Sequence, residues 1–174
     1  LEDMEKVVEM GAVEGMTAAM GQMDPILRGD ILVTRALKAT PQLVYEAWTT
    51  PASFAAWFGG DTIEVPLESV AMDPRPGGAW KATMQLPDGG RIEWVGEYTE
   101  VDPPARLAFT ISDDTANAAT DPGASVTVDI FDAGGPTGMT LIQPRGDFTD
   151  EQVARTTAGY NEFLDSMQRL LNRI

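Results

Sequence analysis

The chain of 174 residues carries a formal net charge of −15 and contains neither histidine nor cysteine. Disulfides, thiolate or imidazole metal sites and histidine-based catalytic triads are therefore excluded within this chain. The acidic balance also argues against nucleic acid and anionic membranes as partners, because both repel a negative surface. No apolar run approaches the roughly 18–20 residues of a membrane span, and the acidic first residues are unlike a basic signal peptide. We therefore expect a cytoplasmic protein with one main domain.

Residues 1–29 differ in composition from the rest of the chain. Met, Gly, Ala and Glu dominate this segment, and its apolar residues recur loosely at helical spacing. Gly11, Gly15 and Gly21 each weaken such a helix by about 1 kcal/mol relative to alanine. We expect an N-terminal extension over residues 1–29, either helical or disordered, and a single domain over residues 30–174.

Two helix starts follow a first predicted strand. Residues 31–37 are rich in residues that favour strands. Thr40-Pro41 and Thr50-Pro51 each combine a capping side chain with a proline at the first helical position. They predict two short helices, the second of which ends at Gly59-Gly60.

Strand patterns and turn signals then alternate as far as residue 143. The expected strands cover residues 62–68, 79–86, 91–101, 106–111, 125–131 and 138–143. Their connections are mostly of hairpin length, which predicts an antiparallel sheet. Pro66 places the first of these strands at a sheet edge or at a bulge.

The last predicted element is a long helix. Thr149 and Gln152 form a Thr-x-x-Gln capping box, and Phe148 and Val153 occupy the positions of a hydrophobic staple. The helix then carries one apolar stripe, made of Val153, Thr157, Tyr160, Leu164, Met167 and Leu171. Because such a stripe needs an apolar partner, we expect the concave face of the sheet to curl around it.

Several short motifs recur in a fixed order from about residue 30 to the C-terminus. They are Val44-x-x-Ala47-Trp48-Thr49-x-Pro51, Trp57-Phe58-Gly59, Arg75-Pro76-Gly77-Gly78-Ala79-Trp80, a segment from Gly96-x-Tyr98 to Phe109-Thr110, and Gly159-Tyr160 with Leu164 and Leu170. In these motifs the chain resembles the START-like (Bet v 1-like, SRPBCC) superfamily, and within it bacterial proteins similar to the C-terminal domain of the activator of Hsp90 ATPase. Tyr160 stands where members commonly carry tryptophan, and residues 1–29 have no counterpart.

The resemblance implies an α+β helix-grip fold. In this fold a seven-stranded antiparallel sheet curls around a long C-terminal helix, two short helices follow the first strand, and a cavity lies between sheet and helix. Members of the superfamily bind lipids, sterols, polyketides or hormones. Some are aromatase/cyclases, and the eukaryotic activator binds a chaperone.

Aromatic and apolar residues are predicted to face this cavity. We expect a small apolar ligand to contact Trp48, Trp57, Phe58, Trp80, Met84, Trp94, Tyr98, Phe109, Tyr160, Leu164 and Met167. The alternative is that these side chains simply fill the core, as aromatic residues usually do.

The strand over residues 91–101 presents two different faces. Glu93 and Glu97 share one face, and Trp94 and Tyr98 share the other, so inward aromatic residues would leave both glutamates in solvent. A bulge near Gly96 would instead turn Glu97 inward, where a raised pKa would suit acid or base chemistry.

The sequence favours a non-enzymatic binding module for a small hydrophobic or amphipathic ligand, with no cofactor, no metal and no assigned catalytic residue. The acidic loop with Asp113, Asp114 and Asp121 lacks the spacing of a calcium loop and is interpreted as solvated.

One alternative function is that of a co-chaperone-like regulatory domain that docks a protein partner on its acidic surface. Another is a cyclase- or hydrolase-type enzyme for an aromatic or polyketide-like substrate, working through Glu97, Tyr98 or Tyr160. A homodimer is also expected, because dimers are common among soluble proteins.

Overall fold

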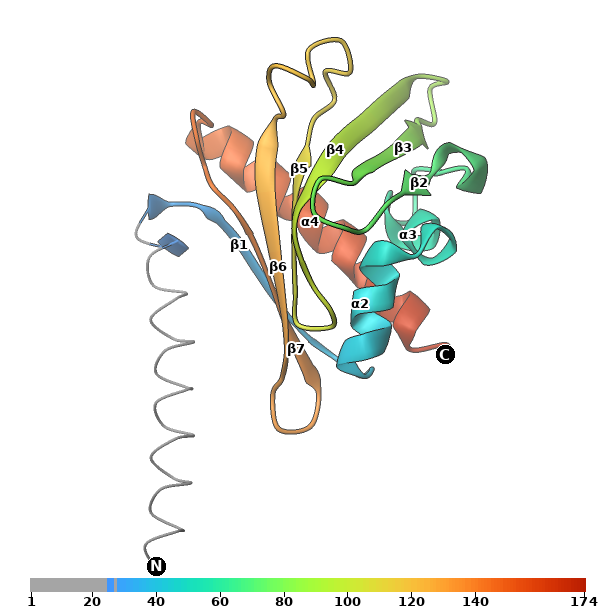
Figure 1. Cartoon of the computed structure of the whole chain (residues 1–174), viewed down its shortest axis with the longest axis vertical. Helices are drawn as coiled ribbons and strands as arrows, with labels where there is room; N and C mark the ends of the chain where they lie inside the picture. The colour runs from blue at the N-terminus through green and yellow to red at the C-terminus, as the bar shows by residue number, and fades with distance from the viewer. Residues whose placement is uncertain (1–24, 27) are drawn as a thin grey trace, which may run out of the picture.

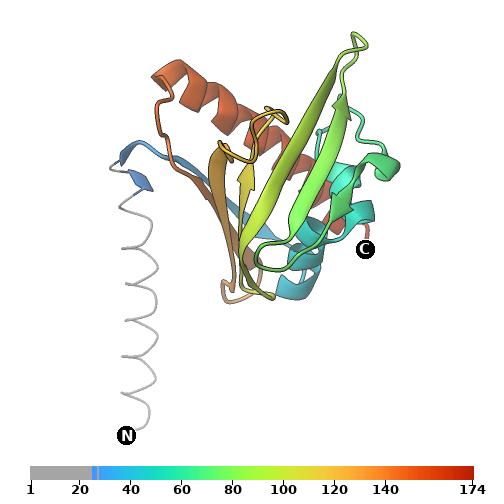
Figure 2. The same cartoon turned by 45° about the horizontal axis from the view of Figure 1, so that its top comes forward.

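One antiparallel sheet curls around the C-terminal helix in the computed structural model, which describes residues 25, 26 and 28–174 (Figures 1 and 2). The described elements are β1 (Ile31–Leu37), α2 (Pro41–Thr49), α3 (Pro51–Trp57), the 3₁₀ turn η1 (Leu67–Ser69), β2 (Ala71–Met72), β3 (Ala79–Gln85), β4 (Arg91–Asp102), β5 (Arg106–Ile111), β6 (Ala124–Asp132), β7 (Thr137–Gln143) and α4 (Asp150–Leu171). The seven strands lie in the order β1-β7-β6-β5-β4-β3-β2. This arrangement confirms the predicted helix-grip fold. The predicted N-terminal extension lies almost entirely outside the described residues.

The two short helices begin where the sequence predicts. The Thr40 hydroxyl accepts a hydrogen bond from the Leu43 amide (3.3 Å), and a proline occupies the first turn of both α2 and α3. Thr50 makes no side-chain cap, so that part of the prediction is wrong; its backbone amide instead donates to the Glu46 carbonyl and continues α2. The Trp57 indole donates to the Ala47 carbonyl (2.8 Å), which ties α3 to α2.

The predicted strand over residues 62–68 is wrong. Only Glu64 bridges to β3, through Gln85, and the chain then turns through η1 into a two-residue strand, β2. Pro66 has no amide hydrogen to donate to a ladder. The Ser69 hydroxyl accepts from the Thr83 amide (3.1 Å), so a side chain replaces the backbone partner that a strand would have supplied.

Strand β4 presents its aromatic residues to the interior and its glutamates to solvent. Tyr98 is buried and Trp94 is half-buried, whereas Glu93 and Glu97 are exposed. The register with β5 shifts between Tyr98 and Glu100 rather than at Gly96. The alternative in which a bulge turns Glu97 inward is therefore wrong.

Helix α4 starts with the predicted capping box. The Thr149 hydroxyl accepts from the Gln152 amide (3.2 Å), and the Gln152 side chain accepts from the Thr149 amide (2.9 Å). The C-terminal part of its apolar stripe is buried, whereas the N-terminal part is only half-buried. No described helix is both long enough and apolar enough to cross a membrane.

Polar contacts hold α4 to β1 and to the segment after α3. The Arg35 guanidinium of β1 donates to the Asn161 side chain (2.7 Å) and pairs with Asp165 (3.1 Å). Near the C-terminal end of α4, Arg169 pairs with Asp61, which lies in the segment after α3 (2.5 Å). The helix therefore packs against β1 and α3 and crosses behind the middle strands of the sheet (Figure 1).

Gly96 allows β3, β4 and β5 to pack closely around one indole. The Trp80 indole, from the neighbouring strand position on β3, passes Gly96 and donates to the Thr110 carbonyl of β5 (2.9 Å). A Cβ atom at residue 96 would overlap both the Thr110 carbonyl oxygen and the Trp80 ring nitrogen. One of these contacts is backbone, so the clash cannot be relieved by a rotamer change.

We expect Gly96→Ala to lower the free energy of unfolding by about 2–3 kcal/mol, the usual cost of overpacking a tight core. Urea denaturation followed by circular dichroism measures this value. Gly159→Ala is the control, because Gly159 lies within α4 and a Cβ there meets no atom within 4 Å. That control should raise the free energy of unfolding by about 0.5–1 kcal/mol. Equal effects of the two substitutions would contradict the packing described here.

Candidate functional site

A pocket of about 680 Å³ lies between α4 and the sheet. Its apolar wall is formed by Phe58, Trp94, Ile111, Ala124, Pro144, Phe148, Tyr160 and Phe163, together with Gly123, Gly146 and Gly159. Its polar wall is formed by Ser112, Asp113, Asp114, Asp121, Gln143, Arg145, Asp147 and Thr156. Both the volume and the aromatic part of the wall are typical of small-molecule sites, which span roughly 300–1,000 Å³.

The pocket lies beside the part of α4 that is less deeply buried, where Val153, Tyr160 and Phe163 pack against the core but are only half-buried. Leu164, Met167 and Leu171 are buried in the hydrophobic core. Towards the N-terminus, the helix presents Gly159 and Thr156 to the pocket, and neither carries a large side chain. At these two positions the helix therefore leaves space in front of the sheet, while Tyr160 still reaches β7.

Aromatic rings form the inner end of the pocket. The Phe58 and Phe163 ring centroids are 5.6 Å apart, and those of Phe58 and Trp94 are 6.5 Å apart. The Trp94 indole nitrogen donates to the Met84 sulfur (3.1 Å), so its polar edge is satisfied within the protein. This part of the wall offers apolar contact to a ligand.

A buried polar pair interrupts the apolar wall. The Tyr160 hydroxyl of α4 donates to the Gln143 side-chain oxygen of β7 (2.6 Å), and Gln143 is only 3% exposed. Burial raises the pKa of Tyr160, so its hydroxyl stays protonated at neutral pH. The pair joins helix to sheet at the pocket and leaves the amide nitrogen of Gln143 without an acceptor among the described residues.

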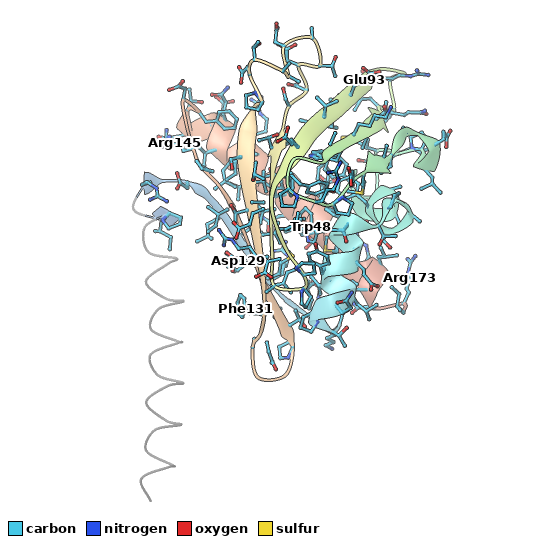
Figure 3. The ribbon with its side chains drawn as sticks, viewed as in Figure 1. Trp48, Glu93, Asp129, Phe131, Arg145 and Arg173 are labelled. Atoms are coloured by element: carbon cyan, nitrogen blue, oxygen red, sulfur yellow. The ribbon has the colours of Figure 1, made fainter. Side chains whose placement is uncertain are left out.

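Two loops form the acidic mouth of the pocket. The β5–β6 loop contributes Asp113, Asp114 and Asp121, and the β7–α4 loop contributes Asp147 and Arg145. Figure 3 shows Arg145 at the end of the molecule where α4 begins. Among the described residues, no three carboxylates gather closely enough to hold a metal ion.

Arg145 is engaged within the protein. Its guanidinium pairs with Asp150 (2.6 Å) and donates to the Phe148 carbonyl (2.9 Å), and its backbone amide donates to the Asp30 carboxylate (3.0 Å). The side chain therefore braces the loop that leads into α4, and its charge is already compensated by Asp150.

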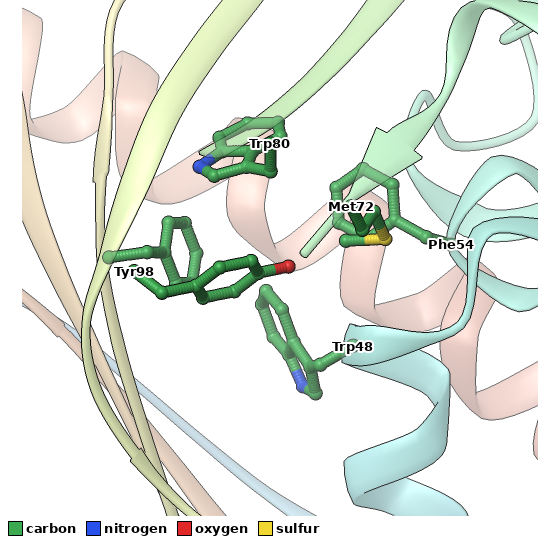
Figure 4. A pocket seen from close by; sticks show the side chains of 6 residues that line it. Trp48, Phe54, Met72, Trp80 and Tyr98 are labelled. Carbon is green, nitrogen blue, oxygen red and sulfur yellow. The ribbon is translucent and has the colours of Figure 1, made fainter. Parts of the chain in front are cut away.

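The structure divides the residues that were predicted to contact a ligand. Phe58, Trp94 and Tyr160 line the large pocket. Trp57, Met84, Leu164 and Met167 lie in the buried core. The remaining predicted residues, Trp48, Trp80, Tyr98 and Phe109, surround a second cavity of only about 10 Å³ together with Phe54 and Met72 (Figure 4). Contact of any of these residues with a ligand stays a prediction.

The small cavity contains an unpaired hydroxyl. Figure 4 shows the Tyr98 hydroxyl between Trp48 and Phe54. This buried oxygen has no hydrogen-bond partner in the described part of the chain, and the surrounding wall is almost entirely apolar. Burial raises the pKa of Tyr98, so the group is a neutral, unpaired hydroxyl in the core.

Sequence reasoning missed much of the pocket wall. Gln143 could have been found, because it follows Met139 and Leu141 on the inward face of β7, where a polar residue is unexpected. Phe163 follows Tyr160 by three residues and therefore shares its helix face. The loop residues carry no such signal, since their positions depend on how the two loops fold around the mouth.

Comparison with known proteins assigns the family. The model of the "Activator of Hsp90 ATPase homolog 1-like protein" family matches residues 38–172, and the chain belongs to this family. The predicted resemblance is thereby confirmed. No functionally curated protein matches the chain.

Solved structures of bacterial proteins share the fold. An AHSA1-like protein from Aeromonas hydrophila is 23% identical, with a TM-score of 0.68 over 83% of this chain and 92% of that chain. An AHSA1 protein from Silicibacter pomeroyi is 22% identical, with a TM-score of 0.68 over 82% of this chain and 97% of that chain. A protein from Nitrosomonas europaea is 21% identical, with a TM-score of 0.68 over 83% of this chain and 94% of that chain. At these identities the likeness shows the fold alone.

We expect Tyr98→Phe and Tyr160→Phe to change the free energy of unfolding in opposite directions. Tyr98→Phe removes an unpaired buried hydroxyl and should raise this free energy by up to about 1 kcal/mol. Tyr160→Phe breaks the hydrogen bond to Gln143 and should lower it by about 1–2 kcal/mol. Urea denaturation of both variants, carried out in parallel with the wild-type chain, measures these changes in the free energy of unfolding. A Tyr98→Phe variant less stable than Tyr160→Phe would contradict the assignment of the two hydroxyls.

Proposed function

We propose that this domain is a non-enzymatic binding module that holds one small hydrophobic or amphipathic molecule between α4 and the sheet. The observation that carries the proposal is the pocket of about 680 Å³ beside half-buried aromatic side chains. A cavity of this size admits a molecule of drug-like dimensions, whereas the second cavity is too small for anything larger than water.

The chemistry of the wall supports this proposal. Trp94, Phe163 and Ile111 are only half-buried where they line the pocket. An apolar ligand would cover their exposed surface and gain roughly 25 cal/mol for each Å² of apolar area removed from water. The buried Gln143–Tyr160 pair supplies the fixed polar point that such sites use to orient a ligand.

The positions of the acid–base candidates favour binding over catalysis. Glu97 is exposed on the outer face of β4, so the enzyme hypothesis that relied on its inward carboxylate is wrong. Tyr98 lies outside the large pocket, and the raised pKa of Tyr160 makes its hydroxyl a poor base at neutral pH. An enzymatic role for the tyrosines stays a prediction.

The protein-docking alternative also stays a prediction. An interaction surface would usually present a contiguous apolar patch of several hundred Å². In the described part of the chain, the exposed large apolar side chains Ile26, Leu67, Phe131 and Ile174 belong to different segments. These scattered residues give less support to docking than the pocket gives to ligand binding.

We expect the protein purified from its own host to carry one small molecule at a stoichiometric level. Native mass spectrometry would show this molecule as a discrete mass increment that disappears on denaturation. Gly159→Phe should abolish the increment, because the new ring extends from α4 into the open space of the pocket.

Gly159→Ala is the matched control, since it changes the same position without filling the pocket. It should retain the increment. Retention by Gly159→Phe at full occupancy, with the variant folded, would contradict the proposed site. A wild-type protein that carries nothing and binds no apolar probe would contradict the function.

A further inference from the structure

The amide nitrogen of Gln143 is a hydrogen-bond donor available to a ligand. Gln143 is only 3% exposed, and its side-chain oxygen already accepts the hydrogen bond from Tyr160. No described residue accepts from its nitrogen, and this atom is not fully shielded from solvent, unlike the hydroxyls of Tyr98 and Thr140. The nitrogen therefore retains contact with the pocket that Gln143 lines.

The mouth of the same pocket is unfavourable for an anion. Asp113, Asp114, Asp121 and Asp147 line it, and Arg145 is the one basic residue of the described lining. The guanidinium of Arg145 is paired with Asp150, so the carboxylates outweigh the one positive charge in the described lining. A side-chain hydrogen bond from Asn117 lowers the pKa of Asp114, which keeps that carboxylate ionised.

We infer, on the basis of the proposed binding function, that the ligand is an uncharged hydrophobic molecule with an acceptor oxygen, such as a ketone, that meets the Gln143 amide. A buried donor left unpaired is costly, so a molecule that supplies an acceptor is selected over an apolar one of the same shape. A carboxylate supplies the acceptor too, but it carries a charge that the acidic mouth repels.

Three naphthalenes of nearly the same shape separate these effects. 2-Acetylnaphthalene has a neutral acceptor, 2-isopropylnaphthalene has none, and 2-naphthoate has an acceptor with a negative charge. Equilibrium dialysis against the full chain gives the dissociation constant of each. At about 50 mM salt, 2-naphthoate should bind at least about tenfold more weakly than 2-acetylnaphthalene, and the ratio should shrink at about 500 mM salt.

The role of Gln143 is tested by a pair of variants. Tyr160→Phe serves as the reference, because it keeps the Gln143 donor. The double variant Gln143→Met/Tyr160→Phe removes the donor without leaving the tyrosine hydroxyl unpaired. The affinity ratio of 2-acetylnaphthalene to 2-isopropylnaphthalene should fall about tenfold from the reference to the double variant.

The outcomes distinguish this inference from the proposed function. Binding of all three naphthalenes with equal affinity in the wild-type chain, or a selectivity ratio unchanged by Gln143→Met, would overturn the inference while leaving the pocket as a binding site. Failure of all three to bind would overturn both. Thermal unfolding of each variant, measured beside dialysis, confirms that the compared proteins are folded.

Discussion

The position of α4 is the constraint on which the rest of the structure depends. The C-terminal half of the helix is fixed by burial of Leu164, Met167 and Leu171 in the core. Arg35 holds the helix to β1, and Arg169 holds it to the segment after α3. Because these attachments lie at the sides and at one end, the helix crosses the middle of the sheet without filling the space beneath its N-terminal half. The pocket is the consequence.

The N-terminal end of α4 is set by a separate group of contacts. The capping box of Thr149 and Gln152 defines the first turn, and Arg145 braces the preceding loop against Asp150 and Asp30. Within the pocket, the hydrogen bond from Tyr160 to Gln143 is the direct polar link between helix and sheet. This hydrogen bond uses only the oxygen of the Gln143 side chain, so the amide nitrogen is left to donate to a ligand in the pocket. The residues that hold the helix to the sheet are thus the same residues that would contact the ligand.

Local signals were sufficient to predict the architecture. Thr-Pro helix starts, hairpin turns and a capping box each act over a few residues, and the structure confirms the elements that they predict. At residues 62–68 the alternation together with Pro66 predicted an edge strand or a bulge, but the chain turns through η1 there and the Ser69 hydroxyl takes a ladder position. The apolar stripe of the last helix predicted the curl of the sheet around it, and the resemblance of the motifs to a known family added the expectation of a cavity between sheet and helix.

The candidate site was harder to predict than the fold, because a cavity forms where side chains leave space unfilled, and no local sequence pattern encodes that space. Trp48 and Trp80 were predicted to contact a ligand, and the structure places them around a cavity of about 10 Å³, where that contact stays a prediction. The larger pocket is lined partly by loops such as the one that holds Asp121, whose folding is not encoded by any periodic pattern. Gln143 carried a usable signal as a polar residue on an otherwise apolar strand face.

Nuclear magnetic resonance can show whether an apolar ligand binds beneath the N-terminal half of α4. Intermolecular nuclear Overhauser effects would be measured between the neutral probe N-phenyl-1-naphthylamine and the isotopically labelled protein. We expect contacts to Trp94, Ile111 and Phe163 at saturation. Contacts confined to exposed side chains such as Leu67 or Phe131 would contradict this expectation.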